Sequence, residues 1–196
     1  MALKSELRDL YKQKRQALDA LTLARLQQQV LEIFATLSFT DIKYCHFFLP
    51  IQKFREPDTR MLMTWLSTHY PAVHQVASKI IPGTYALAHY DQFSASKIRE
   101  NTWGIPEPGD GIEVQGHLLD MVLVPMLIFD KKGHRVGYGK GFYDRFLQAC
   151  RPDCLKMGIS LFEPVDCISD VQAQDIRLDA CISPSKLWLF KDMQSS

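Results

Sequence analysis

The residues best suited to chemistry form a glycine-rich loop, Gly137-Tyr138-Gly139-Lys140-Gly141, between an apolar run and a predicted helix. Three glycines in five positions let the backbone approach an anion closely. The helix predicted from Phe142 offers the loop free N–H groups and the positive end of its dipole. Lys140 adds a positive charge, and Asp144 is placed to hold the magnesium that accompanies a nucleotide. The loop therefore predicts a phosphate-binding site, with a tight turn that binds nothing as the simpler alternative.

The known phosphate-loop patterns do not describe this loop. The Walker A pattern G-x-x-x-x-G-K-[ST] requires Ser or Thr after the lysine, and here Gly141 follows Lys140. The spacing G-x-G-x-G also differs from the dinucleotide-binding G-x-G-x-x-G. The chain has no G-x-S-x-G elbow, which disfavours a serine hydrolase of that type. The prediction of an anion site rests on the lysine, aspartate and arginine side chains that surround the glycines.

Two other segments offer groups to a ligand. In Gln52–Thr59, Asp58 is expected to cap the helix that follows, which leaves Glu56 free to face a pocket. In the proline-rich segment Asn101–Pro108, Trp103 either provides a flat ring for stacking a planar ligand or plugs the core. Both segments are predicted loops, where binding residues are commonly found.

Two carboxylates near the C-terminus are four residues apart, at Asp175 and Asp179. Carboxylates in loops are mostly solvated, and that is the expectation from the sequence alone. If one of them meets Asp144 in space, the pair could complete a magnesium site through water.

The N-terminal segment carries a basic stripe at helical spacing, formed by Lys4, Arg8, Lys12 and Arg15. The simpler interpretation is a solvated helix face. The alternative is that one end of the stripe reaches an anion.

The composition limits the class of protein. With 196 residues, 46% hydrophobic content and a net charge of +1, one globular domain over 1–196 is expected, and a nonspecific nucleic-acid binder is disfavoured. The charged first fifteen residues do not resemble a signal peptide, and the longest apolar run, Met121–Phe129, is too short to span a bilayer. The five cysteines are scattered without a CxxC pair, which predicts reduced thiols and no zinc. We expect a cytoplasmic monomer with neither a membrane nor a nucleic-acid partner.

Apolar periodicity predicts the elements that must position these residues. Helices are expected over 3–19, 22–37 with Thr22 as cap, 58–69 with Asp58 or Thr59 as cap, and from 142 to about 149. Strands are expected over 43–49, 73–81, 84–89, 121–129, 155–160, the end of 175–182, and 187–190, with a surface loop over 97–111.

Because helices and strands alternate, we predict an α/β fold with a mostly parallel sheet. The run Met121–Phe129 is apolar on both faces, as is typical of a central parallel strand. Ligands in such folds bind beyond the C-terminal ends of the strands, which is where the glycine loop begins.

The segment VPMLIFDKKGHRVGYGKGFYDRFL resembles the signature of the 5-formyltetrahydrofolate cyclo-ligase family, also called the 5,10-methenyltetrahydrofolate synthetases. That signature is approximately P-x-x-x-F-D-x-x-G-x-R-[LV]-G-x-G-x-G-[YF]-Y-D-R. Four further blocks match in order: the Lys4/Arg8 helix, FREPDT, NTWGIPEP and QDIRLD. The resemblance covers nearly the whole chain. It implies an α/β fold similar to sugar-phosphate isomerases and CoA transferases.

The resemblance implies an ATP- and Mg²⁺-dependent cyclisation of 5-formyltetrahydrofolate to 5,10-methenyltetrahydrofolate, with release of ADP and phosphate. The γ-phosphoryl group would activate the formyl oxygen as an N5-iminium phosphate, which N10 then attacks. Such chemistry needs positioning and charge stabilisation rather than a protein nucleophile.

By the same resemblance, the ATP-binding residues would be Lys4, Arg8, Arg135, Val136, Gly137, Tyr138, Gly139, Lys140, Gly141, Phe142 and Tyr143. Among them, Lys140, Arg135 and Tyr143 would be catalytic, with Lys140 nearest the transferred phosphate. The folate would contact Ile51, Glu56, Trp103 and Tyr143, with Glu56 on the pterin edge. Asp144 and Asp175 would hold Mg²⁺.

Two positions depart from the family pattern. Position 142 is Phe where family members often have Tyr. This residue can therefore serve a role that needs an aromatic ring but not one that needs a hydroxyl. Tyr138 stands where some members carry arginine, which removes a positive charge.

Two alternatives remain open. One is a protein that sequesters folate or nucleotide, or binds RNA through its basic helix, without catalysis. The other is a sugar-phosphate isomerase on the same fold, which would need an acid/base pair and no ATP.

Overall fold

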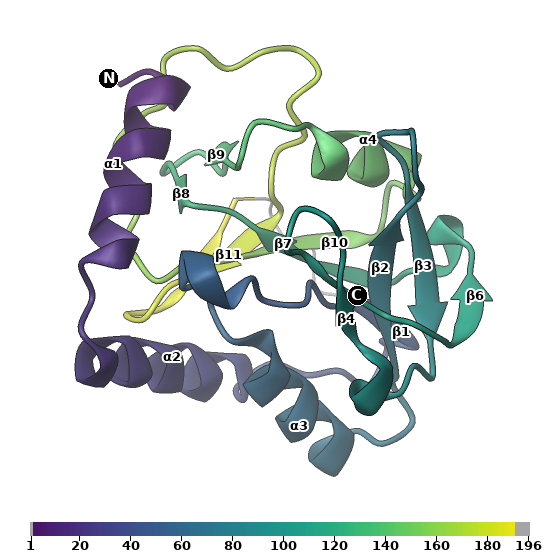
Figure 1. Cartoon of the computed structure of the whole chain (residues 1–196). Coiled ribbons are helices and arrows are strands. Elements are labelled where there is room, and N and C mark those ends of the chain that lie inside the picture. The colour runs from purple at the N-terminus through teal and green to yellow at the C-terminus, as the bar shows by residue number, and fades with distance from the viewer. Residues whose placement is uncertain (1, 191–196) are drawn as a thin grey trace.

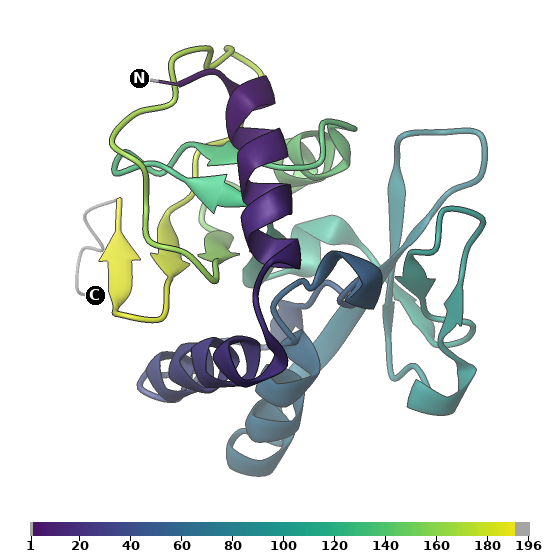
Figure 2. The same cartoon turned by 60° about the vertical axis from the view of Figure 1, so that its left-hand side comes forward.

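The computed structural model describes residues 2–190, so residues 1 and 191–196 of the predicted 1–196 domain lie outside the described part. Four helices surround a central sheet (Figure 1): α1 (Lys4–Gln16), α2 (Ala20–Phe34), α3 (Thr59–His69) and α4 (Phe142–Ala149). Figure 2 shows α1 in front of the sheet and the long segment before β11 (Ala180–Ile182) passing close to the N-terminal end of α1. Among the described residues, no helix combines the length and apolarity needed to cross a bilayer.

The main sheet has eight strands in the order β12-β11-β10-β7-β1-β2-β3-β6. Its five central strands are parallel, and β12, β3 and β6 pair antiparallel at the two edges. The predicted α/β fold with a mostly parallel sheet is therefore confirmed. The strands are β1 (Tyr44–His46), β2 (His74–Ile80), β3 (Leu87–Asp91), β6 (Ile112–Val114), β7 (Met121–Pro125), β10 (Leu155–Ile159), β11 (Ala180–Ile182) and β12 (Leu187–Leu189).

Strand β7 lies at the centre and is buried on both faces, as its apolar sequence predicts. Met121 and Leu123 pack in the cluster that α2 and α3 cover, which contains Phe34 and Leu66. Because side chains alternate along a strand, Val122 and Val124 point the other way, into the cluster that contains Phe146 and Leu147 of α4. The sheet thus separates α2 and α3 from the helix that follows the glycine loop.

The predicted continuous strand 121–129 is wrong at its C-terminal end. β7 stops at Pro125, and β8 (Ile128–Phe129) pairs antiparallel with β9 (Arg135–Val136) in a separate two-stranded sheet. The fully buried Asp130 stabilises the turn between them, because its Oδ1 accepts the N–H groups of Lys132 at 2.9 Å and His134 at 3.0 Å. This hairpin reverses the chain and delivers Arg135 to the start of the glycine loop.

The predicted start of the second helix is also wrong. Asp19, rather than Thr22, caps α2 and accepts the N–H of Thr22 at 2.8 Å and its hydroxyl at 2.7 Å. A carboxylate offers two acceptor oxygens to the helix end and is favoured by its dipole. The prediction of Asp58 as the cap of α3 is confirmed, with its Oδ1 accepting the N–H of Arg60 at 3.1 Å.

Other boundaries differ in smaller ways. α1 ends at Gln16 and α2 at Phe34, each a few residues earlier than predicted. β3 begins at Leu87, because the Thr84 hydroxyl bonds the carbonyl of Ile81 within the preceding turn. β6 was not predicted. The loop predicted over 97–111 contains a short hairpin, β4 (Arg99–Glu100) with β5 (Pro106–Glu107).

A buried polar chain joins β1, β2 and β3 behind α4. The Ser78 hydroxyl lies 2.7 Å from Nε2 of His46 and 2.8 Å from Nδ1 of His89. Burial lowers the pKa of His89 to about 4 and holds that of His46 well below its ordinary value. Both imidazoles are therefore neutral in the folded protein near neutral pH.

We expect the free energy of unfolding to fall as the pH drops from about 6.5 towards 4. The unfolded chain takes up protons on these histidines below about 6.5, whereas folded His89 resists protonation until about 4, so the stabilisation is lost in that window. The loss due to His89 alone is up to about 3 kcal/mol. Urea unfolding at a series of pH values measures it. His89→Gln should flatten this dependence, and a matched change at exposed His69 should leave it as in the wild type; equal slopes for all three proteins would contradict the expectation.

Candidate functional site

The glycine loop adopts the conformation that its sequence predicts. Gly139 and Gly141 have φ of 88° and 71°, in the left-handed region that favours glycine. A Cβ at Gly139 would lie 3.4 Å from the guanidinium carbon of Arg8, so α1 approaches the loop closely. α4 begins at Phe142 as predicted, with Gly141 as its N-cap. Because glycine has no side chain to cap the helix, the first N–H groups of α4 remain available to an anion.

The basic stripe on α1 divides into site residues and solvated residues. Leu7 and Tyr11 pack with Ile128 and Val136 in a small core, which brings α1 against the β8–β9 hairpin. Arg8 Nε donates to the carbonyl of Gly137 at 3.0 Å. The expectation of a wholly solvated stripe is therefore wrong. Lys12 does remain exposed.

Lys4, at the N-terminal end of the stripe, forms an ion pair with Asp175. Asp175 also accepts the N–H of Gln172 at 2.6 Å, so the segment before β11 is held against α1. The second C-terminal carboxylate, Asp179, has a different environment. Its Oδ2 accepts the N–H of Lys156 on β10 at 2.9 Å, so it joins β10 to the start of β11.

Arg135 joins the glycine loop, α4 and the C-terminal segment. Its side chain is only 6% exposed; Nη2 donates to Oδ1 of Asp144 at 2.6 Å, and Nη1 donates to the carbonyl of Ile176. Oδ1 of Asp144 also accepts the N–H of Ile176 at 3.2 Å. Burial lowers the pKa of Arg135, and the charges of Asp144 and Asp175 raise it. The glycine loop is thus surrounded by five charged residues that are far apart in sequence: Lys4, Arg8, Arg135, Asp144 and Asp175.

Asp144 and Asp175 are the carboxylates predicted to hold Mg²⁺, and each is paired with a cation, Arg135 and Lys4 respectively. Within residues 2–190, no group of three or more His, Cys, Asp or Glu is arranged to hold a metal by itself. Mg²⁺ keeps several waters and needs only one or two carboxylates beside phosphate oxygens. The hydrogen bonds recorded at Asp144 use Oδ1 and those at Asp175 use Oδ2. Each residue therefore presents a second oxygen of the kind that Mg²⁺ prefers.

Lys140 lies at the exposed apex of the loop. Its carbonyl accepts Nη1 of Arg145 at 3.3 Å, and the same nitrogen lies 3.1 Å from the carbonyl of Gly141. The backbone at Lys140 is thereby fixed while its ammonium group projects into solvent. Val136 differs from the other predicted nucleotide contacts, because its side chain is 1% exposed and packs in the α1 core, so only its backbone is available to a ligand.

The predicted folate residues Ile51 and Glu56 form a small unit. Glu56 is 5% exposed, and its Oε2 accepts the N–H of Ile51 at 2.7 Å. Burial raises the pKa of Glu56, and hydrogen bonding to Ile51 and Tyr138 and the charge of Arg15 lower it. Burial also raises the pKa of Tyr143, on which Glu56 and Arg135 act with opposite sign. The charges of a predicted folate residue, Glu56, and of a predicted nucleotide residue, Arg135, therefore both act on Tyr143.

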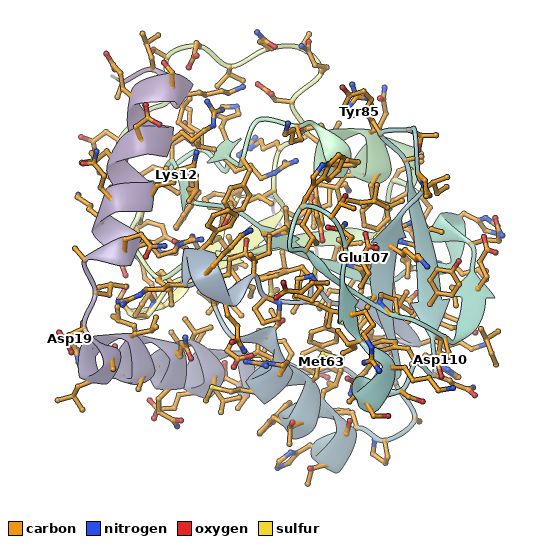
Figure 3. All side chains as sticks on the ribbon, viewed as in Figure 1. Lys12, Asp19, Met63, Tyr85, Glu107 and Asp110 are labelled. Atoms are coloured by element: carbon orange, nitrogen blue, oxygen red, sulfur yellow. The ribbon has the colours of Figure 1, made fainter. Side chains whose placement is uncertain are left out.

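Trp103 is not a core plug. It is 53% exposed, its ring centroid lies 6.1 Å from that of Phe142, and its carbonyl accepts Nζ of Lys53 at 3.1 Å. Tyr85 lies at the tip of the β2–β3 hairpin (Figure 3), and its ring centroid is 5.8 Å from that of Phe142. The phenylalanine ring thus links two exposed aromatic rings at the start of α4.

Sequence reasoning missed three residues at this site. Arg15 is buried and hydrogen-bonds the Tyr138 hydroxyl, although its place in the basic stripe, seven residues after Arg8, puts it on the same helix face. Phe54 stacks on the Tyr138 ring with centroids 5.5 Å apart. Arg145 lies over the Tyr85 ring at 4.8 Å. The Arg15 spacing was visible in the sequence, whereas the aromatic contacts needed the fold.

Two cavities flank these residues. One of about 210 Å³ is lined by Glu56, Gln52, Arg55 and Arg60 and lies beside the predicted folate residues. A larger one of about 630 Å³ lies between β3, β6 and α4, and its lining includes Tyr85 and Arg145. The residue geometry, rather than the cavity size, therefore locates the candidate site.

All five cysteines are free, in agreement with the prediction of reduced thiols. Cys45, Cys154 and Cys181 are buried in the core.

Comparison with solved structures supports the fold. The chain is similar to a 5,10-methenyltetrahydrofolate synthetase from Mycoplasma pneumoniae, with a TM-score of 0.72, 26% identity, and coverage of 92% of this chain and 98% of that one. It is also similar to the Aquifex aeolicus 5,10-methenyltetrahydrofolate synthetase, with a TM-score of 0.76, 27% identity, and coverage of 100% and 96%.

Sequence comparison finds curated relatives over shorter stretches. A probable 5-formyltetrahydrofolate cyclo-ligase of Schizosaccharomyces pombe is 29% identical over 120 residues, which is 54% of this chain and 59% of that protein. The 5-formyltetrahydrofolate cyclo-ligase of Haemophilus influenzae is 47% identical over 55 residues, which is 26% of this chain and 28% of that protein. The chain thus spans about three fifths or less of the length of these relatives.

A family model covers far more of the chain. The model of the 5-formyltetrahydrofolate cyclo-ligase family matches residues 1–176, which include the glycine loop, Arg135, Asp144 and Asp175. The chain belongs to the 5-formyltetrahydrofolate cyclo-ligase family, a family of enzymes.

Proposed function

We propose that this protein catalyses the ATP- and Mg²⁺-dependent cyclisation of 5-formyltetrahydrofolate to 5,10-methenyltetrahydrofolate, with release of ADP and phosphate. One observation carries the proposal besides the family match. Arg8, Arg135 and the ion pair of Lys4 with Asp175 gather around a glycine loop that opens a helix. Cations, open N–H groups and carboxylates in one place are the parts that phosphoryl transfer requires.

The proposed reaction has two chemical steps. The formyl oxygen of the folate attacks the γ-phosphorus of ATP; the bond to the β-phosphate oxygen breaks and ADP leaves with that electron pair. The resulting N5-iminium phosphate has an activated carbon that N10 attacks. The C–O bond then breaks, phosphate leaves with the electron pair, and the N10 proton is released.

The residues support these steps by position and charge. The N–H groups at the start of α4 and the Lys140 ammonium group lie where the phosphates would approach the loop, and they offset the charge that develops during transfer. Tyr143, between Glu56 and Arg135, separates the two substrates and lines both halves of the site. Glu56 accepts hydrogen bonds from the pterin edge, and the exposed Trp103 ring offers a stacking surface. Mg²⁺ between Asp144, Asp175 and the phosphates would supply charge neutralisation.

We expect Asp144→Asn to raise the Mg²⁺ concentration needed for half-maximal activity by roughly tenfold, or about 1.4 kcal/mol of metal binding. The substitution keeps the shape of the side chain and removes the negative charge that the metal uses. A Mg²⁺ titration of activity measures the effect. Asp166→Asn, which removes an exposed carboxylate paired with Lys131, is the matched control and should leave the titration unchanged. An unchanged requirement in Asp144→Asn would remove this residue from the metal site.

The test of the proposed function is a spectrophotometric assay with purified protein, 5-formyltetrahydrofolate, MgCl₂ and ATP. Growth of the near-ultraviolet band of methenyltetrahydrofolate that depends on ATP and stops on chelation of the metal is the expected result. Folate binding without that band would instead support a sequestering protein. The absence of both folate binding and turnover would favour an isomerase on the same fold.

A further inference from the structure

The guanidinium group of Arg145 lies against the backbone of the glycine loop. Its Nη1 donates to the carbonyl of Gly141 at 3.1 Å and to the carbonyl of Lys140 at 3.3 Å. Side chains on a helix lean towards its N-terminus, so Arg145 is placed to reach back over the first turn of α4. A Cβ at Gly141 would lie 2.9 Å from the same nitrogen. The glycine at this position therefore leaves room for the guanidinium group.

The two bonds set the direction of the peptide groups in the loop. In a trans peptide the C=O and the N–H that follows it point in opposite directions, and the described peptide bonds are all trans. The carbonyls of Lys140 and Gly141 point at Arg145, so the N–H groups of Gly141 and Phe142 point away from it. Among residues 2–190 the N–H of Gly141 has no recorded acceptor, and the first N–H of a helix, at Phe142, has none within the helix. Both N–H groups are therefore open to a ligand.

Tyr85 holds the guanidinium group at the place where it makes these bonds. The Cζ atom of Arg145 lies 4.8 Å from the centroid of the Tyr85 ring, within the range of cation–π attraction. The ring centroid of Tyr85 also lies 5.8 Å from that of Phe142, the first residue of α4. The β2–β3 turn fixes Tyr85 in turn, because the hydroxyl of its neighbour Thr84 donates to the carbonyl of Ile81 at 2.8 Å. The tip of this hairpin thus contacts the start of α4.

Stability alone does not explain an arginine at this position. A cation in the first turn of a helix is disfavoured by the positive end of the helix dipole. The recorded hydrogen-bond acceptors of Arg145 are backbone carbonyls rather than carboxylates, so no ion pair offsets that cost. The same arrangement is favourable once an anion is bound, because Arg145 then fixes the donors that face it.

We propose that Arg145, held by Tyr85, is a positioning residue for the phosphate-binding loop. Its bonds turn the carbonyls of Lys140 and Gly141 to one side, so that the N–H groups that follow them are directed to a phosphate of the nucleotide. This inference rests on the proposed function for the identity of the anion. Arg145 acts through the loop backbone and does not itself touch the phosphate. Without its two bonds, either peptide group is free to turn its oxygen towards the anion, which repels it.

The first test is the mobility of the loop amides of residues 139–141, measured by ¹⁵N NMR relaxation in ligand-free protein. Their order parameters should be near the rigid value of about 0.85 in the wild type and fall towards about 0.6 in Arg145→Met. Tyr85→Leu should lower them as well, because it removes the ring that holds the guanidinium group. Tyr85→Phe keeps the ring and should therefore retain an ordered loop.

Arg99→Met is the matched control for the loss of an arginine. Nη1 of exposed Arg99 also donates to two backbone carbonyls, those of Ser96 at 2.7 Å and Ile98 at 2.8 Å. These carbonyls belong to another turn of the chain, so the order parameters of residues 139–141 should stay as in the wild type.

The second test is steady-state kinetics with ATP and 5-formyltetrahydrofolate. Arg145→Met should raise the KM for ATP by about tenfold, the size expected for one hydrogen bond to a charged group. The KM for the folate should stay within about twofold of the wild-type value, because the two N–H groups face the nucleotide. The urea midpoint should be unchanged, since Arg145 is exposed.

A loop that stays rigid in Arg145→Met would overturn the inference. If the KM for ATP rises while the loop stays rigid, the guanidinium group contacts the phosphate directly instead of positioning the loop. Equal loss of order in Tyr85→Phe and Tyr85→Leu would contradict the role of the ring. If Arg145→Met does not fold, Tyr85→Leu decides, because it changes a side chain that is 57% exposed. The relaxation measurement needs no substrate, so a failure of the proposed cyclisation would appear separately, in the wild-type assay.

Discussion

Lys140→Ala is expected to lower kcat by about 10²- to 10³-fold, or roughly 3–4 kcal/mol of transition-state stabilisation. Lys140 lies at the exposed apex of the glycine loop, and its backbone is held by Arg145. Its ammonium group is therefore free to meet the transferred phosphate, where charge develops during the reaction. Steady-state kinetics with ATP and 5-formyltetrahydrofolate measure the loss.

The same substitution should leave the protein folded, because no side-chain hydrogen bond of Lys140 is recorded within residues 2–190 and none would be lost. The urea midpoint should equal that of the wild type. Lys132→Ala is the matched control, since Lys132 is an exposed lysine in the neighbouring β8–β9 turn. Its kcat should stay within about twofold of wild type, as is usual for surface substitutions. Wild-type turnover by Lys140→Ala would rule out the phosphate role.

Arg135→Lys is expected to reduce both stability and activity despite keeping the charge. The Arg135 fork bonds Asp144 and the carbonyl of Ile176 together, and a lysine ammonium group cannot reproduce that planar geometry. Because Arg135 is 6% exposed, a broken contact leaves a buried polar group unsatisfied. We expect a loss of about 2–3 kcal/mol in the free energy of unfolding and roughly 10²-fold in kcat/KM.

Urea unfolding and initial rates test this expectation together. The matched control is Arg177→Lys, because the guanidinium of exposed Arg177 also bridges two acceptors, the carbonyls of Lys132 and Phe190. It should change stability by less than about 1 kcal/mol. If Arg135→Lys behaves like Arg177→Lys, the buried fork does not organise the site.

The local features of the site follow from the sequence because they depend on neighbouring residues. The glycines at 139 and 141 require positive φ, and the helix after them begins at Phe142 as predicted. Asp58 caps α3 for a similarly local reason. The continuous apolar run Met121–Val124 correctly predicts a strand buried on both faces, because a central parallel strand contacts helices on each side.

Predictions from neighbouring residues were wrong at two places, the N-cap of α2 and the C-terminal end of β7. Asp19 and Thr22 are both acceptable caps, and the carboxylate won because it accepts both the N–H and the hydroxyl of Thr22. The apolar run to Phe129 hid the end of β7, because Met126–Phe129, which lead into and form β8, are as apolar as the strand before them.

Contacts between distant segments were decided only by the tertiary structure. Lys4 meets Asp175 and Arg8 meets Gly137 because Leu7 and Tyr11 bury one face of α1 against the β8–β9 hairpin. The sequence of α1 fixes its apolar face and the spacing of its basic residues, but it does not fix which surface that face packs against. Arg15 shows the consequence: its spacing matches that of Arg8, yet it became buried because the packed α1 encloses Tyr138 beneath it. Periodicity is a property of one segment, whereas burial of a charge depends on the segments around it.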